Sequence, residues 1–237
     1  MLILETEILE VIPRAANVKS FRFRAGKDME FQAGQFFFVT IRVEGKESTK
    51  PFSFSNSPTE KGYVEFTKRI TESAYSRALD KMRPGDKARL KLPSGNFTLN
   101  GEYPRIAFLS GGIGITPIRS MCRFAADKGL PVNIVLLYGN NRQEDIIFRQ
   151  DLDELAKINK NMRVVYTLTA ADINRQAWTG RTGYIDARML KEEIPDYPER
   201  VFYLCGPPVM VSGLMDTLKN ALSVAENKIR IENFAGY

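Results

Sequence analysis

A glycine-rich turn, GGIGITP at residues 111–117, has residue types and spacing suited to chemistry. Glycines let the backbone bend sharply and approach a ligand closely, and the free amides at a helix start suit a pyrophosphate. The Thr116-Pro117 pair predicts a helix with Thr116 as its N-cap and Pro117 as its first residue. The segment therefore predicts phosphate binding. The alternative is a tight strand-to-helix turn without a ligand.

The composition argues against several other kinds of chemistry. The chain has no histidine, which removes the commonest general base and the commonest metal ligand. Its two cysteines, Cys122 and Cys205, lie far apart and match no metal-ligand spacing. We therefore expect no metal site, disulfide framework or four-cysteine iron–sulfur cluster. The chemistry is expected to come from a bound cofactor.

Charge and hydropathy limit the expected partners. The net charge is +6, from 34 basic and 28 acidic residues, and the basic residues are scattered among acids. This pattern does not favour nucleic acid, whereas a basic surface can meet an acidic protein. No apolar run approaches the roughly 20 residues of a membrane helix, and the N-terminal segment is acidic where a signal peptide is basic. We expect a cytoplasmic protein with no membrane span; its oligomeric state is left open.

The elements that must position the glycine turn fall into two halves. In residues 1–98, short strand patterns are separated by turn signals, which predicts a small antiparallel β-barrel or sandwich. The predicted strands are residues 2–12, 18–24, 35–43, 51–55, 62–68 and 87–92, with one helix at 73–82. Residues 99–104 are the predicted linker.

From residue 105 the pattern changes to apolar runs that alternate with helical stretches. This alternation predicts an α/β domain at 105–237 with a parallel sheet and helices on both faces. The predicted strands are 106–109, 132–138, 164–168, 201–204 and 229–231, and the predicted helices are 117–128, 146–158 and 208–222. The two halves are expected to pack directly, with the site in the cleft between them.

Two further strings complete an ordered set with the glycine turn: KPFSFSNSP at residues 50–58 and YLCGPPVM at residues 203–210. In this order and spacing the three resemble the ferredoxin-NADP reductase family of FAD/NAD(P)-binding oxidoreductases, over nearly the whole chain. The resemblance implies an FAD-binding barrel followed by an NAD(P)-binding α/β domain.

The first string occupies the place of the family's flavin motif, R-x-Y-S. By this resemblance Phe52 packs against the isoalloxazine and Ser53 reaches toward the flavin N5. Lys50 contacts the phosphate, and Pro51, which follows it, is also counted among the cofactor-binding residues. Lys50 in place of arginine cannot make two parallel hydrogen bonds to a phosphate, and Phe52 in place of tyrosine lacks a hydroxyl. A buried edge strand capped by proline is the alternative.

The next segment, residues 66–79, resembles the family's second flavin segment. Its candidate flavin-binding residues are Thr67, Lys68, Thr71, Ser73 and Ser76. Helix capping explains these hydroxyls equally well.

At the chain's end, the resemblance places Glu232 and Phe234 beside the flavin on the nicotinamide side. Phe234 is expected to move when the nicotinamide approaches. Tyr237 is an alternative cover for the ring.

In the second half the resemblance implies a dinucleotide site. Its candidate residues are Gly111, Gly112, Ile113, Gly114, Thr116, Tyr138, Gly139, Asn140, Asn141, Cys205, Gly206, Pro207 and Met210. Cys205 is expected beside the nicotinamide, and a buried structural cysteine is the alternative. The turn departs from G-x-G-x-x-G because Pro117 replaces the third glycine.

The coenzyme is NADH or NADPH, with NADH favoured. A 2′-phosphate needs cations, yet Thr169, Ala170 and Ala171 follow the third parallel strand. Arg142 and Arg175 are the cations that could still reach it.

The resemblance implies a flavin-dependent NAD(P)H oxidoreductase with Ser53, Cys205 and Glu232 at the reacting rings. Electrons then pass to a redox partner protein: a ferredoxin, a flavodoxin or an iron–sulfur subunit, as in an oxygenase or hydrogenase-like assembly. One alternative is a reductase of free flavin or another small acceptor. Another is a non-catalytic, nucleotide-binding regulatory subunit.

Overall fold

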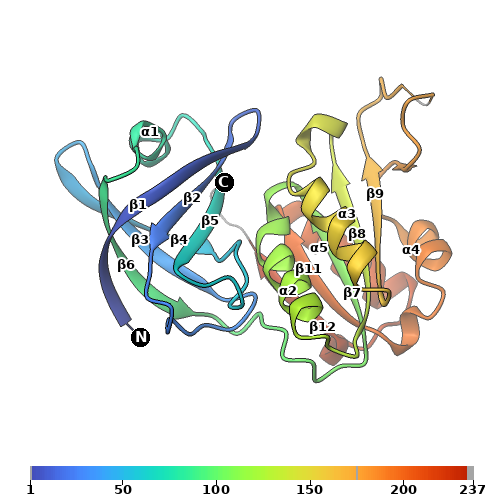
Figure 1. The fold of residues 1–237 in the computed structure, drawn as a ribbon. Helices are drawn as coiled ribbons and strands as arrows, with labels where there is room; N and C mark the ends of the chain where they lie inside the picture. Colours follow the sequence, from blue (N-terminus) through green and yellow to red (C-terminus); the bar gives the residue numbers. More distant parts are fainter. Residues whose placement is uncertain (1, 175, 234–237) are drawn as a thin grey trace.

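The computed structural model describes residues 2–174 and 176–233, which form two units packed side by side. The N-terminal unit is built on an antiparallel sheet that curls into a half-barrel, and the C-terminal unit on a parallel sheet between helices (Figure 1). This confirms the predicted fold class. The limits at residues 98 and 105 stay a prediction.

The N-terminal sheet has six strands in the order β4-β3-β6-β1-β2-β5. They are β1 (Leu2–Ala15), β2 (Val18–Arg24), β3 (Phe36–Val43), β4 (Lys46–Ser53), β5 (Tyr63–Arg69) and β6 (Lys87–Ser94). Strand β1 pairs with β6 through its first residues and with β2 through its last, which lets the sheet curl around one core. Phenylalanines dominate that core, including Phe21, Phe37 and Phe66.

Helix α1 (Ala74–Lys81) closes one end of the half-barrel (Figure 1). It starts where the sequence predicts, because the Ser73 side chain accepts a hydrogen bond from the Ser76 amide at 3.3 Å. Its residues Tyr75 and Leu79 are buried against the half-barrel. The Tyr75 hydroxyl donates a hydrogen bond to the Val39 carbonyl at 2.9 Å. The helix therefore fixes the chain just after β5.

The C-terminal sheet has six parallel strands in the order β10-β9-β8-β7-β11-β12. They are β7 (Arg105–Gly111), β8 (Asn133–Asn140), β9 (Met162–Leu168), β10 (Arg181–Thr182), β11 (Val201–Gly206) and β12 (Ile229–Asn233). Because the strands are parallel, their carboxyl ends share one edge of the sheet. Residues that follow different strands are thereby brought together.

Helices cover both faces of this sheet. Helices α2 (Ile115–Asp127) and α3 (Arg149–Ile158) lie on one face, and α4 (Ala187–Glu193) and α5 (Pro208–Asp216) on the other (Figure 1). Successive strand residues point to opposite faces, so Phe108 packs toward the first pair of helices and Leu109 toward the second. Short helical turns occur at Gly112–Gly114, Gln143–Asp145, Tyr197–Glu199, Thr217–Ala221 and Glu226–Lys228.

Two predictions about the helices of this unit are wrong. The helix after the glycine turn begins at Ile115 with Gly114 as its N-cap, and the Thr116 hydroxyl instead bonds the Ile113 carbonyl at 3.2 Å. Helix α3 starts at Arg149 because Phe148 has a left-handed backbone with φ of 57°. The helix predicted over residues 208–222 is confirmed, as α5 to Asp216 followed directly by a π-helix at Thr217–Ala221. None of the helices in the described ranges is both long and apolar enough to cross a bilayer.

Candidate functional site

A cavity of about 830 Å3 opens at the carboxyl ends of the parallel strands. Its walls come from the segments after β7, β8, β9 and β11 and from α5, and Arg69 of β5 reaches it from the other unit. The predicted dinucleotide-binding residues that line it are Gly111, Gly112, Gly139, Asn140, Asn141, Pro207 and Met210. A parallel sheet places its ligands at this edge.

The glycine turn lies directly against the turn that follows β11. A Cβ atom at Gly114 would come within 2.3 Å of the Cys205 carbonyl oxygen, and one at Gly111 would come within 2.3 Å of the Met210 sulfur. Glycine is thus required at Gly114, where the close atom is backbone, whereas the flexible Met210 side chain could move away from a Cβ at Gly111. Gly112 differs, because its φ is +53° and a Cβ there would meet open space beside the cavity.

The cavity wall also holds a polar side chain that suits a ligand. Asn140 is only 6% exposed, and neither polar atom of its amide has a hydrogen-bond partner among the described residues. A buried amide without partners is costly, and a polar ligand group at this wall can satisfy it. The residues present therefore fit a dinucleotide.

The other predicted residues of this half support the wall from behind. The buried Tyr138 hydroxyl donates to the Gly112 carbonyl at 2.9 Å, which fixes the turn. Half-buried Ile113 and buried Gly114, Thr116, Cys205 and Gly206 make up the rest of this layer.

The three predicted catalytic residues meet at the junction of the two units. The Ser53 hydroxyl at the end of β4 donates to Oε2 of Glu232 in β12 at 3.4 Å. Glu232 is the register partner of Cys205 in the neighbouring strand β11. One hydroxyl, one thiol and one carboxyl, distant in sequence, thus converge.

Burial controls the protonation of this group. It raises the pKa of Glu232 to about 7, although the Ser53 hydrogen bond lowers it. Burial, reinforced by the Glu232 charge, raises the pKa of the Cys205 thiol well above its usual value. Cys205 is therefore a neutral thiol at pH 7, and Glu232 exchanges its proton near that pH.

The flavin side offers two cations and a group of hydroxyls. The pKa of Lys68 is lowered to about 8 by burial and by repulsion from Lys50. The Thr71 hydroxyl lies 3.1 Å from the Ser76 hydroxyl and 3.3 Å from that of Ser73, at the start of α1. A phosphate beside the lysines would relieve their repulsion, and hydroxyls at a helix start can donate to a phosphate, so these residue types fit the pyrophosphate of FAD.

Two predicted flavin residues face the interior instead. Phe52 is 3% exposed and stacks on Phe66 with ring centroids 4.2 Å apart, so its contact with an isoalloxazine stays a prediction that needs the ring to be uncovered. The Thr67 hydroxyl bonds Ser20 at 2.6 Å and Ser55 at 3.0 Å, inside the half-barrel. Pro51 is exposed. Arg175, Phe234 and Tyr237 lie outside the described residues.

The sequence interpretation missed one wall of the cavity. Thr167, Thr169 and the segment 184–186 line it, and the Tyr184 side chain is 79% exposed. The threonines could have been found, because they end a predicted strand whose carboxyl end lies at the cavity edge. Tyr184 follows the two-residue strand β10, for which the sequence has no strand signal.

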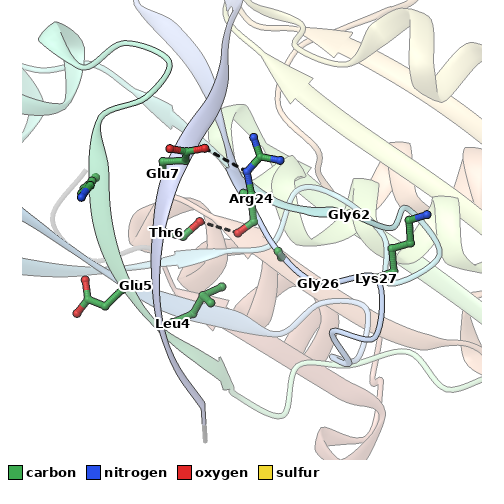
Figure 2. A pocket seen from close by; sticks show the side chains of 10 residues that line it. Leu4, Glu5, Thr6, Glu7, Arg24, Gly26, Lys27 and Gly62 are labelled. Carbon is green, nitrogen blue, oxygen red and sulfur yellow. Dashed lines mark hydrogen bonds and ion pairs between the residues drawn. The ribbon is translucent and has the colours of Figure 1, made fainter.

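A second cavity, of about 790 Å3, lies in the N-terminal unit between β1 and the loop after β2 (Figure 2). Its visible polar contacts are an ion pair between Arg24 and Glu7 at 3.1 Å and a hydrogen bond from Thr6 to the Arg24 carbonyl. These groups satisfy each other near the surface, and no predicted site residue lies here. The predicted dinucleotide-binding residues therefore line the first cavity and not this one.

A half-barrel with paired cations, joined to a parallel sheet with a phosphate turn, defines the class of two-domain flavin and nicotinamide oxidoreductases. Comparison with known proteins leads to the same class. The oxidoreductase FAD-binding domain family matches residues 6–99, and the oxidoreductase NAD-binding domain family matches residues 108–216.

Individual relatives extend over most of the chain. The NADH-cytochrome b5 reductase 1 of Candida glabrata is 30% identical over 223 residues, which cover 89% of this chain and 76% of that protein. The ferredoxin–NADP reductase B of Sorangium cellulosum is 29% identical over 241 residues and 97% of both chains. The glycine betaine monooxygenase reductase subunit of Chromohalobacter salexigens is 28% identical over 218 residues, 90% of this chain, which spans only 59% of that relative's length.

Solved structures share the fold. A ferredoxin NADP+ reductase from Neisseria gonorrhoeae, with bound FAD and NADP, superposes with a TM-score of 0.83 at 22% identity over 98% of both chains. The chain belongs to the ferredoxin-NADP reductase-like family of FAD- and NAD(P)-binding oxidoreductases. This confirms the resemblance seen in the sequence.

Proposed function

We propose that this protein transfers a hydride from a reduced nicotinamide dinucleotide to FAD and then passes electrons to a protein acceptor. The observation that carries the proposal is the convergence of Ser53, Glu232 and Cys205 where the two units meet. When bound, FAD supplies the redox chemistry, taking two electrons as a hydride and releasing them one at a time.

The protein's own residues place the reactants. Ser53 presents a hydroxyl donor on the flavin side, and the neutral Cys205 thiol adds no charge beside a nicotinamide. Glu232 holds a proton that it exchanges near pH 7. Reacting atoms about 3 to 3.5 Å apart gain most from such placement, so few acid–base groups are needed.

We infer that NADH is the preferred coenzyme. Arg142, a candidate partner for a 2′-phosphate, is bound to Asp172 at 2.8 Å, so a phosphate must compete with a carboxylate. Two carboxylates, Asp145 and Asp186, also line the cavity. Negative groups of this kind favour a ribose diol over a phosphate.

The coenzyme inference predicts the effect of Asp172→Asn. Releasing Arg142 should raise the kcat/KM for NADPH severalfold, because the freed guanidinium can pair with the 2′-phosphate, and should leave the value for NADH nearly unchanged. Steady-state kinetics with both coenzymes measure this. The double variant Asp172→Asn/Arg142→Gln is the control and should lose the gain; an equal gain in both variants contradicts the role of Arg142.

We propose a small acidic redox protein, such as a ferredoxin, flavodoxin or iron–sulfur subunit, as the acceptor. The net charge of +6 suits an acidic partner. The names of two relatives refer to a ferredoxin and to a monooxygenase reductase subunit. Reduction of a small acceptor at the same rate without any protein partner would favour the alternative noted above.

The experiment that tests the proposal is anaerobic reduction of the purified protein. FAD-loaded protein should lose its visible flavin absorbance on addition of NADH, and more slowly with NADPH. Protein that holds FAD and is bleached by neither nucleotide would support the regulatory alternative. Protein that cannot be loaded with FAD would contradict the flavin site.

A further inference from the structure

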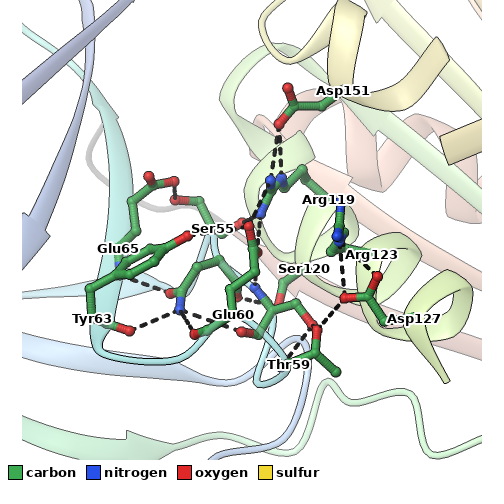
Figure 3. Close-up of polar contacts among 12 residues, drawn as sticks. Ser55, Thr59, Glu60, Tyr63, Glu65, Arg119, Ser120, Arg123, Asp127 and Asp151 are labelled. Atoms are coloured by element: carbon green, nitrogen blue, oxygen red, sulfur yellow. Dashed lines mark hydrogen bonds and ion pairs between the residues drawn. The ribbon is translucent and has the colours of Figure 1, made fainter. Parts of the chain in front are cut away.

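A cluster of buried charges lies between the two units, away from the dinucleotide cavity. Its centre is Arg119 of α2, which is only 7% exposed (Figure 3). The Arg119 guanidinium forms a two-point ion pair with Glu60, whose second contact is 3.1 Å, and donates to the Ser55 carbonyl at 3.1 Å. Both partners belong to the N-terminal unit, so the side chain crosses the interface.

The same guanidinium is also held within its own unit. It donates to Oδ2 of Asp151 in α3 at 3.0 Å, so one side chain links α2, α3 and the loop between β4 and β5. The next residue adds a second crossing contact, since the Ser120 hydroxyl donates to the Asn56 carbonyl at 2.7 Å. Residues 55, 56 and 60 of the loop are therefore fixed to α2.

An aromatic side chain completes the cluster. Two guanidinium groups lie over the Phe148 ring, with distances to the ring centroid of 4.8 Å for Arg14 and 5.7 Å for Arg119. Phe148 is buried with φ of 57° and ψ of 19°, a backbone conformation that is costly for a bulky residue. Such strain persists only where the surrounding contacts determine the conformation.

The position of this cluster connects it to both halves of the site. The Ser55 carbonyl that Arg119 holds lies two residues after Ser53. Helix α2 begins directly after the glycine turn that packs on the Cys205 carbonyl. Arg119 thus joins the segment that carries the flavin-side hydroxyl to the helix that carries the nicotinamide-side turn.

We propose that Arg119 is a positioning residue for hydride transfer: it fixes the distance between the flavin side and the nicotinamide side by holding the Ser55–Glu60 loop against α2. The inference rests on the proposed function. Arg119 touches neither reactant and acts through the placement of Ser53 and Cys205. A misplacement of about 1 Å in such a site can cost roughly 100-fold in rate.

The test uses Arg119→Gln in FAD-loaded protein, with hydride transfer followed by anaerobic stopped flow at saturating NADH. We expect the rate to fall by about 10- to 100-fold, with FAD content and the KM for NADH little changed. The long-wavelength absorbance of stacked flavin and nicotinamide should weaken, and Arg119→Lys should recover part of the rate. If NADH does not reduce the flavin of the wild-type protein, the proposed function itself is wrong. If only the wild-type protein is reduced rapidly, the result concerns the role of Arg119.

Arg200→Gln is a matched control. Arg200 is 5% exposed and, like Arg119, makes several hydrogen bonds, but its partners Asp196, Ile106 and Asn133 all belong to the C-terminal unit. This variant should lose stability while keeping the wild-type rate below its melting temperature. An equal loss of rate in Arg200→Gln and Arg119→Gln would show a general effect of destabilisation and overturn the proposal.

A second measurement does not depend on activity. Spin labels at Lys46→Cys and Lys157→Cys, both exposed and in different units, report the distance between the units, while Cys122 and Cys205 are buried. Pulsed electron paramagnetic resonance should give a broader or shifted distance distribution for Arg119→Gln than for the labelled protein that keeps Arg119. If Arg119→Gln does not fold, Glu60→Gln replaces it, because this variant removes the same ion pair across the interface. The same changes in rate and in distance distribution are then expected. An unchanged distribution together with a wild-type rate overturns the proposal.

Discussion

Glu232 illustrates how one side chain connects burial, protonation and stability. Its pKa rises from 4.5 to about 7, mainly because burial disfavours the charged carboxylate. A folded state that prefers the protonated form binds protons more tightly than the unfolded chain between these pH values. Its contribution to stability is therefore complete below pH 4.5 and is lost as the pH rises through about 7.

We accordingly predict a pH-dependent difference between wild-type protein and Glu232→Gln. Between pH 4.5 and about 7 the wild-type protein should lose free energy of unfolding relative to the variant, because glutamine does not ionise. Chemical denaturation of nucleotide-free protein at several pH values measures the difference. A difference that stays constant over this range contradicts the raised pKa of Glu232.

At the scale of elements, the contact between the glycine turn and the turn after β11 positions the dinucleotide wall. Gly114 ends a helical turn just before α2, and Gly206 ends β11. A Cβ at Gly206 would lie 3.2 Å from the Gly111 backbone nitrogen and oxygen, and one at Gly114 would lie 2.3 Å from the Cys205 carbonyl oxygen. The two turns are therefore so close that a side chain at Gly114 would have to displace backbone.

Gly114→Ala should reveal this close packing. The added methyl group must displace backbone rather than a flexible side chain, so we expect a loss of about 1–3 kcal/mol of stability and weaker NADH binding. Thermal melts and dinucleotide titrations measure the two effects. Gly213→Ala in α5 is the control for stability, because a Cβ there meets nothing within 4 Å and helical alanine is favoured by about 0.5–1 kcal/mol. Unchanged melting of Gly114→Ala would contradict the steric argument.

At the scale of the whole molecule, the two units are joined by a charge cluster as well as by apolar contacts. Burial by itself raises the pKa of Glu60, but the Arg119 charge and hydrogen bonds to Arg119 and Ser57 outweigh it and lower the pKa below 4.5. The stabilisation is therefore present above pH 4.5 and is lost as the pH falls through the lowered pKa.

Glu60→Gln should lower the free energy of unfolding at pH 7 by about 3 kcal/mol, the cost of breaking a buried ion pair. The deficit should shrink as the pH falls below 4.5, because wild-type Glu60 then also becomes neutral. Denaturation curves at pH 7 and at acidic pH measure both values. A deficit that is the same at both would show that the ion pair with Arg119 is not its origin.

Much of the fold could be predicted from the sequence because local patterns encode it. Alternating apolar residues and turn signals identified strand β2 (Val18–Arg24) to the residue, and Ser73 identified the start of α1. The strand β10 and helix α4 could not be recognised, since a two-residue strand and a helix of about two turns carry too little periodicity. The Thr116 cap was wrong because Gly114, without any capping side chain, fits beside the Cys205 carbonyl.

The sequence by itself determined the two-unit architecture, because periodicity reports local backbone geometry. Its resemblance to the reductase family predicted the phosphate turn and pointed to Ser53, Cys205 and Glu232. Only the tertiary structure decided which distant groups meet: the Ser53–Glu232 contact, the exposed Tyr184 at the cavity and the Arg119 cluster across the interface. It also placed Phe52 in the core. Burial and contact depend on how the two sheets and their helices pack, and residues far apart in the chain carry no local signal of that packing.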